Sequence, residues 1–67
     1  MKFTIEFNCD NDAFGETTEE LTQEVARIVT QTAERVSYLG NPRDRMAGIE
    51  YCLRDVNGNR VGFARFE

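Results

Sequence analysis

The side chains that could do chemistry in this 67-residue chain are mainly carboxylates, and they gather near its start. Residues 1–26 hold seven acids and one lysine, for a net charge of −6, whereas residues 27–67 hold seven arginines and five acids, for +2. Six of these early acids lie just before the expected helix or in its first turns: Asp10, Asp12, Glu16, Glu19, Glu20 and Glu24. Carboxylates along one edge can imitate a phosphate backbone and steer a protein to a basic groove. Acids at a helix start also complement the helix dipole and aid solubility, and this second interpretation stays open.

The residue types that most often catalyse reactions are scarce. There is no histidine, which removes the commonest general base and the usual partner of a serine or cysteine nucleophile. Ser37 is the only serine, and it falls on the polar side of the expected helix. We therefore expect neither an enzyme nor a cofactor.

Metal binding is also not expected. Asp10-Asn11-Asp12 begins like a calcium loop, but the fifth and twelfth positions, which need oxygen ligands, hold Phe14 and Leu21. Two cysteines without histidine cannot complete a four-ligand zinc shell. A turn that leads into the helix explains this stretch better.

Arginines offer an alternative binding surface. Four of them lie in the expected loop after the helix or near the expected hairpin: Arg43, Arg45, Arg54 and Arg60. They could contact phosphates in a small dimeric nucleic-acid-binding regulator. An isoelectric point near 4.7 argues against this alternative, because nonspecific affinity for nucleic acid depends on positive charge.

One long helix must organise the elements that position these residues. Its apolar side chains recur with a period of 3.6 residues: Leu21, Val25, Ile28, Val29, Thr32, Val36 and Leu39. Thr17 and Glu20 have the spacing of a capping box. Gly40 followed by Pro42 predicts that the helix ends with Gly40 in the left-handed backbone conformation. The predicted helix therefore covers Thr17 to Gly40.

Three strands are expected around the helix. Residues 2–9 and 48–54 alternate apolar and polar side chains, and residues 60–66 follow an Asp55–Asn59 hairpin turn. The order is β-α-β-β, an α+β fold in which one helix packs on a three-stranded mixed or antiparallel sheet. The third strand fits best between the first two, within a single domain covering residues 1–67.

The register of the hairpin has two alternatives. A two-residue turn on Asn57-Gly58 pairs Tyr51 with Ala64 and Glu50 with Arg65. A turn that opens on Asp55, with Gly58 in a left-handed bulge position, pairs Leu53 with Val61. We favour the second because it places more apolar area under the helix. Either register leaves Cys52 with a phenylalanine on the face away from the helix.

The chain length and the two cysteines lead to expectations about oligomeric state, cellular compartment and disulfide formation. A chain of this size has a thin core, so a homodimer through the open sheet face is a natural remedy. A structural component that only associates with itself through this face is a further alternative function. No stretch resembles a membrane span or a signal peptide, and we expect a cytoplasmic protein. In that compartment Cys9 and Cys52 are expected to be buried thiols rather than a disulfide.

The strand before Asp10–Phe14, the single helix, and the closing Leu53–Gly62 segment resemble very short proteins of phages, prophages and other mobile elements. The likeness covers most of the chain, but its sharpest part, the hairpin, is a structural motif. Small acidic proteins of this group are similar to inhibitors of host defence, anti-CRISPR proteins among them. The resemblance implies a host protein or nucleoprotein complex as the partner. It implies no particular functional residue.

Overall fold

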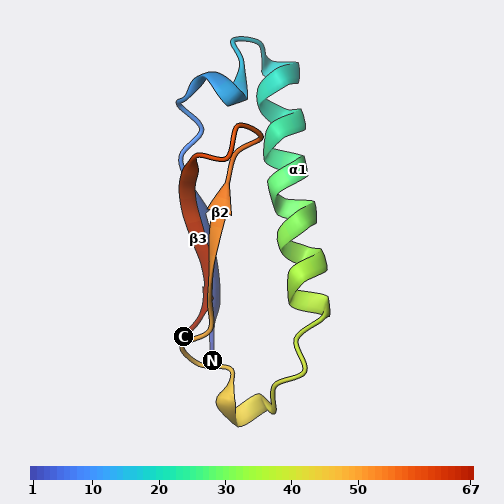
Figure 1. Cartoon of the computed structure of the whole chain (residues 1–67), viewed down its shortest axis with the longest axis vertical. Helices are drawn as coiled ribbons and strands as arrows, with labels where there is room; N and C mark the ends of the chain where they lie inside the picture. Colours follow the sequence, from blue (N-terminus) through green and yellow to red (C-terminus); the bar gives the residue numbers. More distant parts are fainter.

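The computed structural model describes residues 1–67 as one helix packed along a three-stranded sheet, with two short 3₁₀ turns (Figure 1). The elements, in chain order, are β1 (Phe3–Phe7), η1 (Asp12–Phe14), α1 (Thr18–Ser37), η2 (Arg43–Arg45), β2 (Glu50–Arg54) and β3 (Arg60–Phe66). The predicted α+β class and the β-α-β-β order are confirmed. Strands β1 and β2 are shorter than the alternating segments that predicted them.

The helix starts where the sequence predicts. The Thr17 hydroxyl oxygen accepts a hydrogen bond from the backbone N–H of Glu20 at 3.1 Å, which makes Thr17 the N-cap. The end differs, because α1 stops at Ser37 and Gly40 does not adopt the left-handed conformation. The N–H groups of Tyr38 and Leu39 donate to carbonyls three residues back, so the last carbonyls are satisfied without a glycine cap.

The sheet has the strand order β1-β3-β2, and β3 is antiparallel to both neighbours. Strands β1 and β2 are therefore parallel to one another but separated by β3, as expected for the split arrangement. Gly62 lies in β3 where β1 crosses closely: a Cβ added there would collide with the backbone oxygen of Glu6. Only glycine allows this approach of the two backbones.

The hairpin combines both predicted alternatives. The turn opens on Asp55, and Gly58 has a φ of 85°, as in the favoured form. A bulge between Leu53 and Arg54 then shifts the register, so that Tyr51 pairs with Ala64 and Leu53 with Gly62. The favoured pairing of Leu53 with Val61 is thus wrong, because the bulge adds one residue to β3.

The fully buried apolar core is small and extends from one end of the molecule to the middle of the sheet, where Ala64 pairs with Ile5. It consists of Phe14, Ile28, Leu53 and Ala64. Phe14 is completely buried beneath the start of α1, and its ring stacks 6.4 Å from that of Phe7. In Figure 1 this end is the upper one, where η1, the first turns of α1 and the hairpin turn come together.

The sheet face away from the helix is more polar than the sequence predicts. Cys52 pairs with Phe63 there, but the Arg65 guanidinium lies 4.5 Å from the centre of the Phe63 ring and shields it. Arg65 also forms ion pairs with Glu50 at 3.6 Å and Glu67 at 3.3 Å. Cys9 and Cys52 are both free thiols and half-buried.

Candidate functional site

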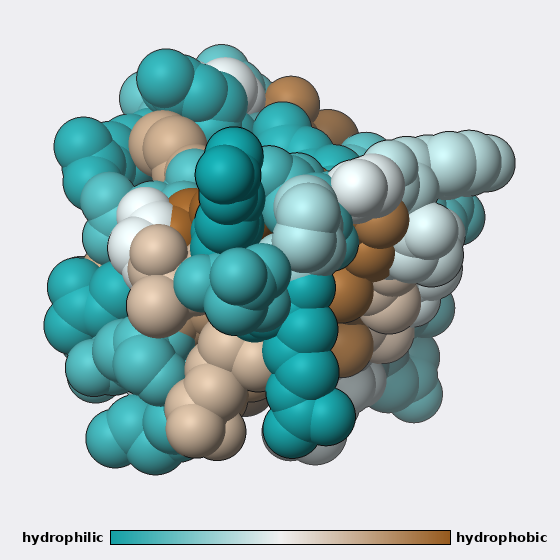
Figure 2. All heavy atoms as spheres, turned by 90° about the horizontal axis from the view of Figure 1, so that it is seen from below, coloured by the Kyte–Doolittle hydropathy of each residue, from teal (hydrophilic) through white to brown (hydrophobic).

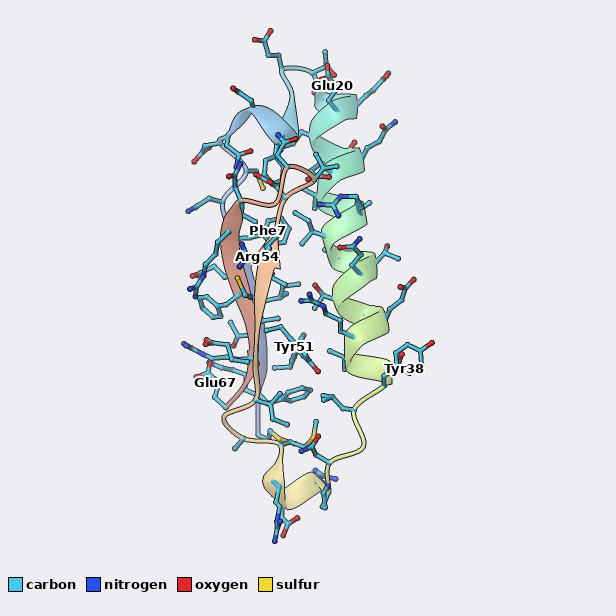
Figure 3. All side chains as sticks on the ribbon, in the orientation of Figure 1. Phe7, Glu20, Tyr38, Tyr51, Arg54 and Glu67 are labelled. Atoms are coloured by element: carbon cyan, nitrogen blue, oxygen red, sulfur yellow. The ribbon has the colours of Figure 1, made fainter.

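The six acids singled out from the sequence do not share one environment. Five of them are exposed and lie where η1 leads into α1, the end at which Figure 3 labels Glu20. We call these five the acidic end: Asp10, Asp12, Glu16, Glu19 and Glu20. Glu24 is buried, with 7% of its surface exposed, and does not belong to this surface. Its place in a predicted acidic edge is therefore wrong.

Glu24 instead joins the helix to the hairpin. Its carboxylate accepts hydrogen bonds from Arg27 Nε at 2.6 Å and Arg27 Nη2 at 2.9 Å. It also accepts one from the backbone N–H of Val56, in the hairpin turn, at 2.8 Å. The hydrogen bonds from Arg27 lower the pKa of Glu24, and the Val56 N–H adds to this, against the opposing effect of burial. The same pairing raises the pKa of Arg27.

A second buried carboxylate, Asp55, organises the hairpin turn. It accepts hydrogen bonds from the backbone N–H groups of Asn57 and Asn59, each at 2.9 Å. The side-chain amides of Asn59 and Asn11 donate to it at 3.3 and 2.7 Å. Burial acts to raise the pKa of Asp55, but these hydrogen bonds outweigh it, led by that of the Asn59 N–H, and the pKa is lowered.

These two carboxylates hold three segments together at the acidic end. Asn11 binds Asp55 and also caps η1 by accepting a hydrogen bond from the Ala13 N–H at 3.0 Å. Because Glu24 binds the next residue of the same turn, η1, α1 and the hairpin are tied by one polar network. The loop that carries Asp10 and Asp12 is therefore fixed to the rest of the fold rather than hanging free.

Four carboxylates remain without a partner in the chain. Glu20 accepts a hydrogen bond from the Thr17 hydroxyl at 3.1 Å. The side chains of the other four make no hydrogen bond or ion pair within the molecule: Asp10, Asp12, Glu16 and Glu19. The nearby Arg27 is already committed to Glu24. Their negative charge is thus not neutralised by the fold.

The four arginines of the alternative surface are split between two places. Arg43 and Arg45 form η2, at the lower end of Figure 1, whereas Arg54 and Arg60 pair beside the hairpin turn. The molecule is 42 Å long, and Arg54 already donates a hydrogen bond to the Gly58 carbonyl at 3.0 Å. They therefore do not form one phosphate-binding patch.

Two other arginines, which the sequence alone did not single out, bind backbone carbonyls at an edge of the sheet. Arg35 Nη1 donates to the carbonyl of Cys52 at 3.0 Å, and Arg27 Nη2 donates to that of Arg54 at 3.2 Å. Both carbonyls belong to β2, an edge strand. The spacing of eight residues, or two helical turns, is the signal in the sequence: it puts both arginines on one flank of α1.

The rest of the surface offers no enclosed site. The hollow nearest the acidic end is open and is lined by Ala13, Glu20, Gln23, Glu24 and Arg27. No three side chains of histidine, cysteine, aspartate or glutamate are grouped so that they could hold a metal ion. The helix lacks the apolar character that crossing a membrane requires.

Comparisons of the chain with protein-family models, with curated proteins and with solved structures gave no match. The interpretation of the acidic end therefore depends on its own geometry and charge.

Proposed function

We propose that this chain is a non-catalytic interaction protein that binds a basic groove of a host protein through its acidic end and so inhibits it. The observation that carries the proposal is the set of four exposed carboxylates with no partner in the chain, mounted on a loop and helix start that the buried network holds in place. Such a surface presents fixed negative charge without first having to order a flexible segment.

The proposed partner is a protein that handles nucleic acid. Its groove would be lined with lysine and arginine side chains, to which fixed carboxylates are attractive in the same way as phosphates. The resemblance to short phage and mobile-element proteins supports a host defence complex as the target, with inhibition of the anti-CRISPR kind. Occupying the groove would exclude the nucleic acid that normally lies there.

A pair of matched variants tests which carboxylates matter. Asp12→Asn/Glu16→Gln removes two charges from the acidic end, and Glu34→Gln/Asp44→Asn removes two exposed charges from elsewhere, so both variants have the same net charge. Immobilised wild type and both variants are incubated with a bacterial lysate at about 0.05 and 0.2 M salt. We expect wild type and the control to retain a common partner, and the acidic-end variant to lose most of it.

Salt gives a second readout on the same partner. At 0.1 M salt, attraction between exposed charges is largely screened beyond about 10 Å, and this distance shortens as salt rises, so recovery should fall at the higher salt concentration. Equal recovery of the partner by both variants, at both salt concentrations, would contradict a role for the acidic end. With a purified partner, inhibition of its nuclease activity or nucleic-acid binding should follow the same order.

Direct nucleic-acid binding by the chain is the competing function. The net charge of −4 and the separation of Arg43 and Arg45 from Arg54 and Arg60 give it no continuous basic surface. A gel shift with labelled duplex DNA and RNA at low salt should show no retarded band at micromolar protein. A band that disappears in Arg43→Gln/Arg45→Gln would instead support the regulator function.

A further inference from the structure

The outward backbone groups of the two edge strands differ in whether side chains bind them. On β2, Arg27 and Arg35 occupy outward-facing carbonyls, as described above. Beside β1, Lys2 exchanges both backbone hydrogen bonds with Glu67, at 2.6 and 2.7 Å. In an antiparallel pair the groups alternate in direction, so Phe3, Ile5 and Phe7 turn their N–H and C=O groups outward from the sheet. No hydrogen bond from a side chain reaches them, and β1 is the open edge.

The helix also leaves the β1 side of its own sheet face uncovered. Because Arg27 and Arg35 lie on the flank of α1 that reaches the β2 edge, the opposite flank, which carries Val29, faces the β1 side. Val29 is 45% exposed, Phe3 42% and Ile5 38%. Phe7, farther along the same strand, is half-buried against Phe14. Figure 2, seen from the end with both termini, shows hydrophobic atoms reaching the surface between polar side chains.

We propose that a second copy of this chain covers this region by pairing its β1 with β1 in antiparallel orientation, around a two-fold axis at Thr4. The sheet then continues from one copy into the other, with both helices on the same face. Such strand addition satisfies the outward N–H and C=O groups of β1.

The register is set by two independent features. With Thr4 opposite Thr4 of the second copy, Phe3 lies opposite Ile5, so the two exposed apolar side chains of the strand cover one another. On the other face Lys2, the only lysine of the chain, lies opposite Glu6. Both residues are exposed and neither forms an ion pair within its own chain. The two-fold axis creates each of these pairs twice.

The neighbouring register fits less well. With Ile5 opposite Ile5, the exposed Phe3 faces Phe7, which already packs on Phe14, and Glu6 faces Thr4 instead of Lys2. Backbone geometry allows both registers, because each brings outward-facing residues into hydrogen-bonded pairs. Charge and burial together favour the register centred on Thr4.

Charge exchange between Lys2 and Glu6 tests the proposal on folded protein, because both side chains are solvent-exposed. Sedimentation equilibrium over a range from about 10 μM to 1 mM should show a species of twice the 7.7 kDa chain mass. Lys2→Glu or Glu6→Lys alone turns two attractive pairs into two repulsive ones, and the dissociation constant should rise roughly tenfold. The double variant Lys2→Glu/Glu6→Lys should return to within about threefold of wild type. Glu34→Lys, with the same charge change as Glu6→Lys but on an exposed helix position outside both β1 and the acidic end, is the control and should associate at least as well as wild type.

Amide hydrogen exchange locates the contact independently. The N–H groups of Phe3 and Ile5 should be protected at high concentration and exchange faster on dilution, whereas that of Glu6, bonded to β3, should stay protected.

Two results would overturn the proposal. One is a monomer at all concentrations, which would leave the edge open to a foreign strand instead. The other is a dimer whose association the single reversals leave unchanged, or which the double variant does not restore. Sedimentation of the purified chain measures self-association alone, so either result is independent of whether a host partner exists.

Discussion

The two ends of the molecule differ in how completely their side chains are buried. At the acidic end, Phe14 is completely buried and two buried carboxylates tie η1, α1 and the hairpin together. At the opposite end, where η2 and both termini lie, no residue is fully buried, and Phe3, Tyr38 and Met1 are exposed. A chain this short has enough apolar side chains to complete a core at one end only. The end without a complete core is where a second molecule has most to cover.

The largest expected effect compares two β-branched residues on the same helix. Ile28→Ala, in the core near the acidic end, should lower the free energy of unfolding by about 2–5 kcal/mol, because it removes a fully buried side chain and leaves a cavity. Val36→Ala, a half-buried position nearer the open end, should cost about 1 kcal/mol. Urea denaturation of dilute protein measures both. Equal losses would show that stability is spread evenly along the molecule.

The polar network gives the next comparison. Glu24→Gln should lower the free energy of unfolding by about 1–2 kcal/mol, since it weakens charge-assisted hydrogen bonds from Arg27 and Val56. Glu19→Gln, on the same helix but exposed, should change it by less than about 0.5 kcal/mol. Thermal unfolding at pH 7 is the measurement. A cost at Glu19 as large as that at Glu24 would mean that the buried network adds no stability of its own.

Lowering the pH should weaken the same network. The folded pKa values of Glu24 and Asp55 are both lowered from ordinary values of 4.5 and 3.8. A lowered folded pKa gives stability that is present above the unfolded pKa and is lost as the pH falls through the folded one. Stability should therefore be constant near neutral pH and fall below about pH 4.5, and the fall should be shallower in Glu24→Gln. A wild-type profile that is flat from pH 6 to 2.5 would contradict this coupling.

The smallest expected effect lies between the helix and the sheet. Tyr51 lies between the sheet and α1 (Figure 3). Its hydroxyl is buried without a hydrogen-bond partner, although its ring centre lies 5.8 Å from the Arg35 guanidinium. Tyr51→Phe removes the hydroxyl and keeps the ring, so stability should be unchanged or rise by up to about 1 kcal/mol. A clear loss would reveal a hydrogen bond to the hydroxyl in solution.

Local patterns in the sequence were enough to predict the elements and their order. The helical period of α1, the Thr17 cap and the hairpin at Asp55–Asn59 follow from short-range rules, and the central position of β3 follows from the rules for strand connections. Gly40 was misjudged because the final turn of α1 satisfies its carbonyls with tighter bonds, and no local pattern distinguishes that end from a glycine cap. The hairpin register depended on one bulge, whose position reflects packing under the helix.

The candidate site was harder to predict for a related reason. Exposed acids such as Asp12 and Glu16 could be recognised from charge alone, but charge does not tell which acid turns inward. Glu24 is buried only because Arg27 and the Val56 N–H meet it there, a contact across 32 positions of the chain. Asp55 was recognised as a turn residue, yet its bond to Asn11 spans 44 positions. Such contacts come from the assembled fold and not from spacing.

The two helix arginines that bind carbonyls of β2 have a consequence for how far assembly can proceed. A sheet with two free edges can add strands on both sides, which is how short β-rich chains grow into fibres. Here any sheet formed across β1 would end, on both outer sides, in a β2 strand in which Arg27 and Arg35 occupy two of the outward carbonyls. These contacts would disfavour the addition of a further strand at β2, so the proposed assembly would stop at two chains. Arg35→Ala leaves the pair of Arg27 with Glu24 in place but frees the Cys52 carbonyl on both outer sides, and light scattering would then detect particles larger than a pair.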